Sequence, residues 1–399
     1  MLTSKDIIAK TEKYGARNYS PKEVVIEKAS GAIAISPEGK QYFDMLSAYS
    51  ALNLGHCHPE IVAAAKAQLD KVTLTSRAFH NSVLCEFYES LCNLTNKNMI
   101  LPMNTGAEAV ETAIKCARRW GNYIKGVKDG EQEIIVCGRN FHGRTSTIIS
   151  FSTDNSARKG FGPYSCGFKI IPFGDIKALS AAINDNTVAF LVEPIQGEAG
   201  IIVPPEGYLK KVRGICTDNN ILFIADEVQT GFARTGKMFA CQHEEVEPDI
   251  YILGKALGGG IMPVSAVAAD SSILGVFDNG SHGSTFGGNP LAAAIAVKTI
   301  EILVKGDYAA QAEEKGKYFM DKLRAIINDD IKEIRGKGLL IGVEFKSSAA
   351  PYVKKLIEGG VLAKDTNRQT IRFAPPLIIT YAQLDAACVI IAEAFSGKN

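Results

Sequence analysis

The feature that most constrains the fold is a series of short runs that are apolar throughout, separated by helical patterns, from about residue 99 onward. The runs are NMILPMN, EIIVCG, TVAFLVEP, ILFIADE and DIYILGK, and the helical patterns include GAEAVETAIKCARRWG, ALSAAIND and GYLKKVRGICTDNN. A strand that is apolar on both sides needs both of its faces buried, whereas a strand with one solvated face alternates. The pattern therefore predicts an α/β core, with a mostly parallel sheet covered by helices on both faces.

The pattern changes at about residue 290. After the long helical pattern NPLAAAIAVKTIEILVKGD, helices mix with shorter strand patterns such as GLLIGVEF and TIRFAPPL. A chain of 399 residues is long enough for a large domain with a smaller one packed on it. We expect a large domain over residues 51–289 and a small α+β domain over residues 290–399. Residues 1–50, with the strand pattern GKQYFD, are expected to join the small domain or to cross to a neighbouring subunit.

Formal charge is nearly balanced, with 44 Lys and Arg residues against 43 Asp and Glu residues. Such a chain has no overall field that would attract nucleic acid or an anionic membrane, so we expect a small-molecule partner. It contains no stretch of about 18 or more apolar residues, and no apolar segment before a cleavage site. The nine cysteines form no CxxC pair, which is typical of a compartment where thiols stay reduced. We therefore expect a cytoplasmic protein.

Two charged residues follow apolar runs, at the strand ends where ligands bind in open α/β sheets. Asp226 ends ILFIAD, with Gln229 three residues later, and Lys255 lies between DIYILG and ALGGG. An aspartate that leaves a buried strand is partly desolvated and needs a partner, but an N-cap or a structural ion pair would satisfy it equally well. A lysine after a strand is most often a solvated loop charge, so Lys255 gains a functional meaning only from partners elsewhere.

The segment LPMNTGAEAVETAIKCARRW predicts a strand, a turn and the start of a helix. Thr105 and Glu108 have the spacing of a capping box, and the N–H groups of Gly106 and Ala107 would then be free to face an anion. A plain capped helix is the alternative. The chain has no GxxxxGKS or GxxxxGKT run and no GxGxxG after a strand, so neither a Walker-type site nor a dinucleotide site is predicted.

The histidines of GHCHP give only a weak indication of a metal site. His56 and His58 stand in His-x-His spacing without an obvious carboxylate or a further histidine, and a helix that begins near Pro59 explains the segment better. We predict no metal.

A cofactor that carries both an aldehyde and a phosphate would use the remaining features. A lysine forms a Schiff base with an aldehyde when its neutral form is accessible, and burial beside apolar groups favours that form. Pyridoxal 5′-phosphate also needs an acid against its pyridine nitrogen, an anion-binding turn and a wall over its ring. Asp226, the turn at Gly106 and Ala107, and Phe141 of GRNFHGRT meet these needs.

The chain resembles the fold type I pyridoxal phosphate enzymes, and more narrowly the class III, or omega, aminotransferases. The resemblance covers nearly the whole chain and rests on NTGAEA, FHGRT, VEPIQGEAG, ADEVQTGFARTG, LGKALGGG and STFGGNP, in that order. It implies that Lys255 forms the aldimine with the cofactor and acts as general base and then acid, with Asp226 as the partner of the pyridinium. The other cofactor contacts that it implies are Thr105, Gly106 and Ala107 at the phosphate, Phe141 stacked on the ring, His142, Gln229 at the ring hydroxyl, and Ser284 and Thr285, which would reach the phosphate in the neighbouring subunit of a homodimer.

Within that class, the chain is most similar to enzymes that transfer the terminal amino group of L-ornithine to 2-oxoglutarate, giving glutamate 5-semialdehyde and glutamate. YGARNYSP and MLSAYSALNLGHCHP carry this finer resemblance, through the pocket residues Tyr19 and Tyr49. It implies that Tyr19 binds the α-amino group and Arg144 the α-carboxylate of ornithine. A guanidinium matches a carboxylate, and a phenol accepts from an ammonium. Glutamate needs a second cation, Arg372, which Glu198 is expected to mask during the ornithine half-reaction; a permanent structural pair is the alternative.

Three other functions share these motifs wholly or in part. An aminotransferase for N-acetylornithine, or for another omega-amino acid, would use every catalytic motif but would not need Tyr19 to meet a charged amine. An aminomutase or racemase on the same scaffold would need no keto acid acceptor. A structural or regulatory protein that only binds the cofactor would not need Lys255, Asp226 and both arginines.

Overall fold

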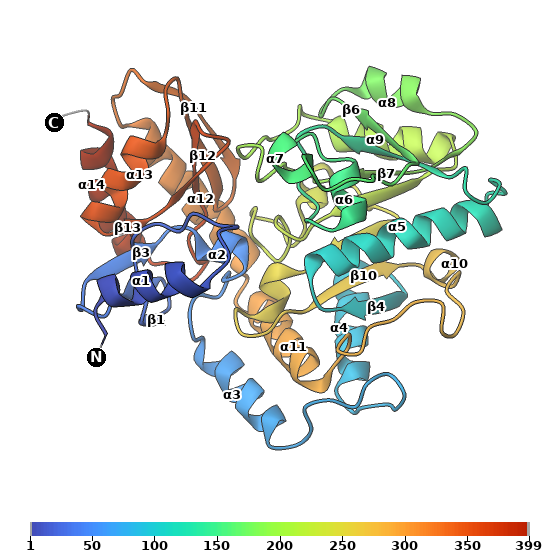
Figure 1. Ribbon diagram of the computed structural model, residues 1–399, viewed down its shortest axis with the longest axis horizontal. Coiled ribbons are helices and arrows are strands. Elements are labelled where there is room, and N and C mark those ends of the chain that lie inside the picture. Colours follow the sequence, from blue (N-terminus) through green and yellow to red (C-terminus); the bar gives the residue numbers. More distant parts are fainter. Residues whose placement is uncertain (1, 397–399) are drawn as a thin grey trace.

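A seven-stranded, mostly parallel sheet forms the centre of the computed structural model, which describes residues 2–396 (Figure 1). The strand order is β4-β10-β9-β8-β7-β5-β6. The five strands from β9 to β6 pair in parallel, while β10 runs antiparallel to both β9 and β4. The predicted α/β core is confirmed. The strands are β4 (Met99–Met103), β5 (Glu133–Cys137), β6 (Phe168–Ile171), β7 (Thr187–Val192), β8 (Leu222–Asp226), β9 (Ile250–Leu253) and β10 (Ser265–Ala269).

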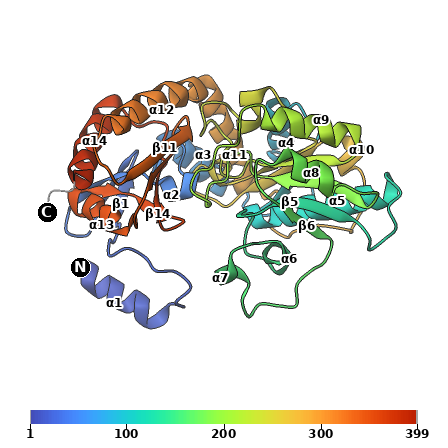
Figure 2. The same ribbon diagram turned by 90° about the horizontal axis from the view of Figure 1, so that it is seen from above.

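Helices cover both faces of this sheet, which is why its strands are apolar throughout. In β8, Leu222 and Ile224 belong to the core that contains α5 and α10, whereas Phe223 and Ala225 belong to the core that contains α8 and α9. Helices α8 and α9 pack on each other on the same side of the sheet (Figure 2). These helices are α5 (Gly106–Tyr123), α8 (Ile176–Ala182), α9 (Tyr208–Asp218) and α10 (Ser271–Leu274).

A second, antiparallel sheet lies toward the C-terminus, in the order β11-β12-β15-β14. The predicted strand patterns GLLIGVEF and TIRFAPPL form β12 and β15. Helices α12 and α13 contact this sheet, and α14 packs on both of them, in orange and red in Figure 1. The elements are β11 (Ile331–Lys337), β12 (Leu340–Phe345), β14 (Lys364–Thr366), β15 (Thr370–Phe373), α12 (Tyr308–Arg324), α13 (Ala350–Gly359) and α14 (Tyr381–Phe395).

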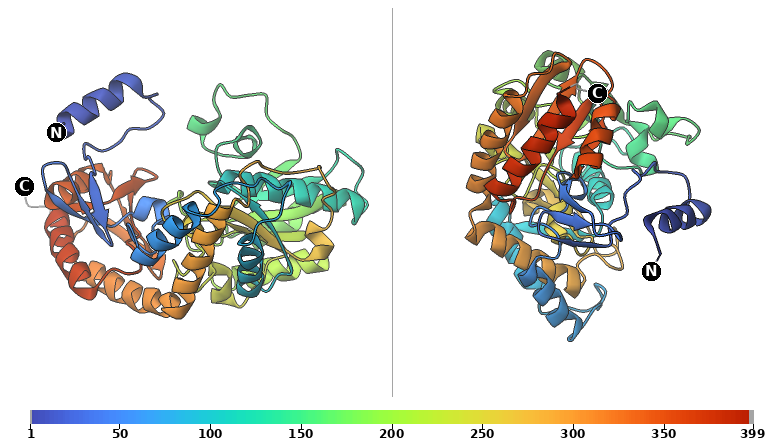
Figure 3. Two further views of the ribbon diagram at one scale, coloured as in Figure 1. Left: turned by 90° about the horizontal axis from the view of Figure 1, so that it is seen from below. Right: turned by 90° about the vertical axis from the view of Figure 1, so that its left-hand side faces the viewer.

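The N-terminal segment shares a third sheet with the C-terminal part of the chain. Its order is β1-β2-β3-β13, and the pairing of β3 with β13 is parallel, with Phe43 opposite Val361. The first helix, α1 (Ser4–Tyr14), stands away from the body of the chain and has no buried residue (Figure 3). The strands are β1 (Lys28–Ser30), β2 (Ile33–Ile35), β3 (Gln41–Asp44) and β13 (Val361–Leu362).

A long helix, α11 (Pro290–Lys305), follows the large sheet in the chain. It packs on α3 (Pro59–Leu69) and α4 (Leu84–Thr95) as well as on α12. Because α11 contacts elements on both sides of the expected boundary, the division at residues 51–289 and 290–399 stays a prediction. The helix expected near Pro59 is α3. Across residues 2–396, no helix has the length and apolar character needed to cross a membrane.

A buried arginine that follows β8 of the seven-stranded sheet contacts residues beside β12 and β15 and a residue of the segment after β3. Arg234 is fully buried and donates to Asn53 Oδ1 at 2.6 Å, to Leu339 O at 3.0 Å and to Pro375 O at 2.6 Å. These bonds satisfy a charge that would otherwise be costly to bury. The remaining elements are short: α2 (Ser47–Ser50), α6 (Ser146–Ser150), α7 (Asn155–Arg158) and the 3-10 helices η1 (Ala240–Glu244) and η2 (Lys255–Gly258).

Candidate active site

A cavity of about 200 Å³ lies at the carboxyl edge of the large sheet, where β8 and β9 end. Lys255 begins η2 directly after β9, in a left-handed backbone conformation with φ of 47°. The structure brings together seven of the residues predicted from the sequence on the wall of this cavity: Gly106, Ala107, Phe141, His142, Asp226, Gln229 and Lys255.

The charge on Lys255 is set by two opposing influences. Burial lowers the pKa of its ammonium group, and Arg372 lowers it further. The carboxylates of Asp226 and Glu198 raise the pKa, but burial outweighs them, so the net shift is downward. The neutral amine needed for a nucleophile or a general base is therefore more accessible than in a solvated lysine.

Asp226 is a buried carboxylate with two partners. Its Oδ2 accepts from His142 Nδ1 at 2.6 Å, and its Oδ1 accepts from the Val228 N–H at 3.1 Å. Burial lowers the pKa of the His142 imidazole, but the hydrogen bond and charge of Asp226 raise it by more, so the net shift is upward. These two hydrogen bonds hold the predicted partner of the pyridine nitrogen in a fixed orientation.

Glu193 also lines the cavity, although no role was predicted for it from the sequence. It directly follows β7, so it carried the same signal as Asp226: an acidic residue that leaves an apolar strand. It accepts from the Phe141 N–H at 3.0 Å and from the Gly197 N–H at 3.3 Å. Burial raises the pKa of its carboxyl to about 7, against the opposing effect of His142. Glu193 is therefore a group that titrates near neutral pH, next to the Asp226–His142 pair.

The turn between β4 and α5 has the predicted capping box. Thr105 Oγ1 accepts from the Glu108 N–H at 3.2 Å, and Glu108 Oε2 accepts from the Thr105 N–H at 2.7 Å. Gly106 and Ala107 form the first turn of α5, whose N–H groups have no partner within the helix. A Cβ on Gly106 would come 3.1 Å from Val228 Cγ1, so glycine keeps this turn close to the cavity wall. The turn offers N–H donors and the positive end of a helix dipole to an anion.

Glu198 and Arg372 form an ion pair beside the cavity, with 2.6 Å between Glu198 Oε1 and Arg372 Nη1. Arg372 is almost completely buried. Burial works to raise the pKa of Glu198, but Arg372 outweighs it and holds the pKa below its usual value. Gln229 contacts both members, since Arg372 Nη1 donates to Gln229 Oε1 at 3.4 Å and Gln229 Nε2 donates to Glu198 Oε1 at 3.5 Å. The ion pair is therefore hydrogen-bonded to Gln229, a residue of the cavity wall.

Tyr49 lies next to this ion pair. The guanidinium of Arg372 lies 4.8 Å from the centre of the Tyr49 ring, and Lys364 Nζ donates to the Tyr49 hydroxyl at 2.8 Å. Tyr19 and Tyr49 line one outer hollow of about 370 Å³. Tyr19 itself is 73% exposed and does not reach the Lys255 cavity in this chain. The structure thus brings the two tyrosines together, but apart from Lys255.

Arg144 lies at the outer end of the site. Its guanidinium is 5.4 Å from the centre of the Phe141 ring, and its Nη1 is 3.8 Å from Asp154 Oδ2. Arg144 is exposed and lines a hollow of about 490 Å³ together with Glu198 and Phe141. An exposed guanidinium at this place is free to meet a carboxylate.

Ser284 and Thr285 are outside the Lys255 cavity. Ser284 Oγ accepts from Asn104 Nδ2 at 2.7 Å, and Thr285 is exposed. Their expected contact with the neighbouring subunit stays a prediction. Within residues 2–396, no group of three or more His, Cys, Asp or Glu side chains is arranged to hold a metal ion.

Comparison with known proteins gives the family. Residues 14–395 match the family model described as aminotransferase class-III. The chain is 60% identical over 381 residues to an ornithine aminotransferase of Brevibacillus brevis, covering 96% of each. Its structure is similar to that of the ornithine aminotransferase of Toxoplasma gondii, with a TM-score of 0.98, 42% identity, and 99% of this chain and 96% of that one covered. It is also similar to the acetylornithine aminotransferase of Elizabethkingia anophelis, with a TM-score of 0.91 and 44% identity over both whole chains.

The fold and the cavity are those of a fold type I enzyme that depends on pyridoxal 5′-phosphate. The chain belongs to the class-III aminotransferase family. The side chains around the cavity fit the cofactor of this family: an amine at Lys255, a fixed carboxylate at Asp226, an aromatic wall at Phe141, and free N–H groups beside Gly106, where a side chain would crowd Val228.

Proposed function

We propose that this enzyme transfers the terminal amino group of L-ornithine to 2-oxoglutarate, giving glutamate 5-semialdehyde and glutamate. The observation that carries the proposal is the Glu198–Arg372 ion pair beside the cavity. A site that takes a terminal amine from one substrate and an α-amine from a dicarboxylate needs a cation for the second carboxylate of the dicarboxylate. That cation must be paired with an anion while the other substrate is bound, because a free cation would bind the carboxylate of that substrate in the wrong place. The similar proteins named ornithine aminotransferase from Brevibacillus brevis and Toxoplasma gondii support the same substrate.

We propose that Asp226, Gln229, Phe141 and the first turn of α5 hold pyridoxal 5′-phosphate. When bound, this cofactor supplies the aldehyde that accepts the amino group and a ring that draws electrons from the neighbouring carbon. Lys255 Nζ, whose pKa is lowered by burial, takes a proton from the substrate carbon that bears the amino group and later returns a proton. The hydrogen bond from the His142 ring fixes the orientation of the Asp226 carboxylate, which would pair with the ring nitrogen of the bound cofactor.

Substrate choice follows from where the positive charges lie. Ornithine has one carboxylate, which Arg144 binds at the outer end, while Tyr19 accepts from its α-ammonium group. With Glu198 on Arg372, the inner part of the site has no free cation that would bind the ornithine carboxylate in the wrong place. Glutamate brings a second carboxylate, and Arg372 binds it once the Glu198 side chain moves away.

The complete enzyme is proposed to be a homodimer in the cytoplasm. Ser284 and Thr285 do not reach the cavity of their own chain, which supports a role in the site of a second copy. All nine cysteines are free thiols, which suits a reducing compartment. The mass of the purified enzyme in solution, from light scattering, tests the dimer: a monomer that is fully active would exclude shared sites.

The substrate is tested by adding L-ornithine to the purified enzyme without any keto acid. We expect the visible absorption of the bound cofactor to change to that of its amine form, and a cyclic imine derived from the semialdehyde to be trapped in the same tube. N-acetylornithine is the second candidate, because the acetylornithine aminotransferase of Elizabethkingia anophelis is similar over its whole length. A spectrum that responds to N-acetylornithine and ignores ornithine would reject the proposed substrate and retain the reaction type.

A further inference from the structure

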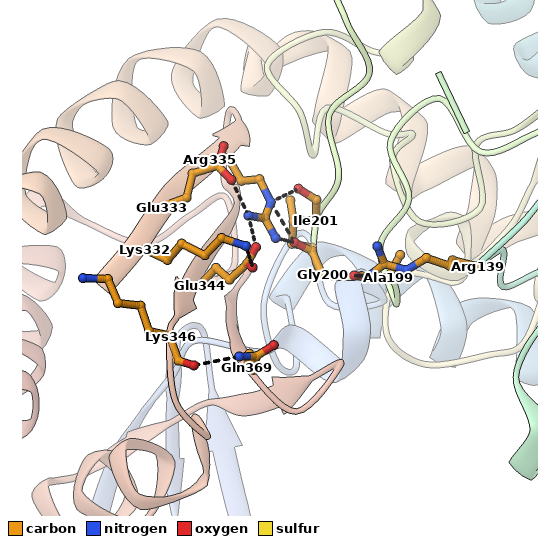
Figure 4. Close-up of polar contacts among 10 residues, drawn as sticks. All are labelled: Arg139, Ala199, Gly200, Ile201, Lys332, Glu333, Arg335, Glu344, Lys346 and Gln369. Carbon is orange, nitrogen blue, oxygen red and sulfur yellow. Dashed lines mark hydrogen bonds and ion pairs between the residues drawn. The ribbon is translucent and has the colours of Figure 1, made fainter. Parts of the chain in front are cut away.

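The loop that carries Glu198, residues 197–201, is held by its backbone carbonyl groups. Thr366 Oγ1 donates to Glu198 O at 2.5 Å. Arg139 Nη2 donates to Ala199 O at 2.7 Å (Figure 4). The backbone on which the Glu198 side chain stands is therefore fixed from outside the loop.

Arg335 on β11 binds the next two carbonyls. Its Nη2 donates to Gly200 O at 2.6 Å, and its Nε donates to Ile201 O at 3.0 Å (Figure 4). Its Nη1 donates to Glu344 Oε2 at 2.5 Å and to Glu333 Oε2 at 2.7 Å. The two carboxylates fix the plane of the guanidinium, so its other N–H groups are oriented in advance toward the loop.

The strand register explains why the loop lies here. Arg335 on β11 is opposite Gly342 on β12, which is opposite Arg372 on β15. Directly opposite residues in an antiparallel sheet point to the same face, so the two arginines stand on either side of a glycine. A Cβ on Gly342 would come 3.1 Å from Gly200 O and 3.1 Å from Ile201 Cβ. The backbone of the loop therefore packs against Gly342, which has no side chain that would push the loop away from the sheet.

We propose that Arg335 is a positioning residue for the Glu198–Arg372 pair and thereby sets the preference between the two amino donors. This inference rests on the proposed function. Arg335 does not line the Lys255 cavity, and it acts only by keeping the loop backbone next to the sheet that carries Arg372. With the backbone held, Glu198 leaves Arg372 only by rotating its side chain. With the backbone loosened, the whole residue can move away.

Replacing Arg335 is therefore expected to change the two half-reactions unequally. Arg335→Gln removes the fork that binds Gly200 and Ile201, which makes the uncovered form of Arg372 more accessible. We expect kcat/KM for ornithine, relative to kcat/KM for glutamate, to fall by about tenfold, the effect of losing one or two hydrogen bonds to a charged group. Each value is measured as a single half-reaction, by the visible absorption of the holoenzyme.

Lys332→Gln is the matched control, because Lys332 Nζ also binds Glu344, at 2.6 Å, but contacts no carbonyl of the loop. The control should leave the ratio of the two kcat/KM values unchanged. A purely structural role for Arg335 would lower both half-reactions in the same proportion, and an unchanged ratio in Arg335→Gln would overturn the proposal.

Two further tests extend the proposal, and the first of them does not depend on Arg335→Gln folding well. Gly342→Ala adds a methyl group that pushes the loop away from the sheet while Arg335 remains. The ratio of kcat/KM for ornithine to kcat/KM for glutamate should then fall, as in Arg335→Gln. An unchanged ratio would contradict the proposal. In a Glu198→Gln background, where no ion pair remains to be positioned, adding Arg335→Gln should change the ratio no further. A full additive shift in that background would mean that Arg335 acts by another route.

The proposed substrate and this inference can fail separately. If the wild-type enzyme ignores ornithine but uses N-acetylornithine, the substrate proposal fails, and the same ratio is then measured with N-acetylornithine against glutamate. The inference fails if the Arg335 or the Gly342 variant leaves the ratio at its wild-type value, or if Arg335→Gln shifts the ratio in full in the Glu198→Gln background.

Discussion

Replacing Lys255 by Ala removes the amine on the cavity wall, whose pKa the carboxylates of Asp226 and Glu198 influence. The variant should still bind pyridoxal 5′-phosphate non-covalently, because the groups proposed to hold the ring and the phosphate are elsewhere. Loss of the general base should lower kcat by at least about 10³-fold. Turnover and the visible spectrum of the same sample measure both effects. Lys346→Ala, on an exposed lysine, should keep full activity. Substantial activity in Lys255→Ala would contradict the assignment of Lys255 as the general base.

Glu193 predicts a specific dependence of stability on pH. Its carboxyl has a pKa of about 7 in the folded protein, against 4.5 for an ordinary glutamate. The native state therefore holds a proton that the unfolded chain has released between these values, and the free energy of unfolding falls as the pH rises through this window. The fall due to this group is roughly 2 to 3 kcal/mol between pH 5 and pH 8.

Glu193→Gln cannot titrate, so it should lose this part of the pH dependence. Urea unfolding of the cofactor-free protein at pH 5 and pH 8 is the measurement, with Glu358→Gln on the exposed surface of α13 as control. As the pH rises from 5 to 8, the free energy of unfolding of the wild type should fall relative to that of Glu193→Gln. A difference that stays constant over this range would show that Glu193 is ionised at both values.

At the scale of secondary structure, two helices with the same capping box allow stability to be separated from cofactor binding. Thr105 caps α5 at the cavity, and Thr380 caps α14 with Gln383. Replacing either threonine by Ala should cost about 1 kcal/mol of unfolding free energy. Only Thr105→Ala should also weaken the binding of pyridoxal 5′-phosphate, measured by titration of the apoenzyme. Equal cofactor affinity in both variants would mean that the α5 turn does not hold the phosphate.

The sequence predicted the strands that are buried on both faces, because such strands are apolar throughout. It missed β10, whose sequence SAVAA is mostly alanine and has little strand propensity; this segment becomes a strand because β9 and β4 bind it on both sides. It also missed the short strand β6. The capping box at Thr105 was predicted correctly, since its signal is local.

The cavity and the outer end of the site differed in how far they could be predicted. Asp226 and Lys255 follow apolar strands, a pattern visible in the sequence. The carbonyl contacts of Arg335 join residues that are 134 and 135 positions apart in the chain, and no local pattern contains such contacts. Lys364, which donates to Tyr49, depends on strand register, because it lies opposite Arg372. These contacts are properties of tertiary structure.

At the scale of the whole molecule, α1 and Tyr19 are exposed parts of the N-terminal segment that bear on the proposed homodimer. Helix α1 stands apart from the body with no buried residue, and Tyr19 is exposed. Both belong to the N-terminal segment that was expected to join the small domain or to cross to a neighbour. Its strand β3 does pair with β13, whereas residues 2–30 include no buried residue. A second copy would supply a surface for them to pack against.

A mixed dimer tests whether the two active sites share residues. Thr285→Asp would place a carboxylate against the phosphate in the partner's site, and Lys255→Ala disables the site of its own chain. If Thr285 serves the second copy, a dimer of one Lys255→Ala chain and one Thr285→Asp chain has one site with both an intact Lys255 and an intact Thr285. We expect it to regain about half of the wild-type activity, although each variant alone is nearly inactive. The two variants are co-expressed with different tags and the mixed dimer is purified through both. If Thr285 instead serves its own chain, neither site of the mixed dimer is complete, and the activity stays at the level of the separate variants.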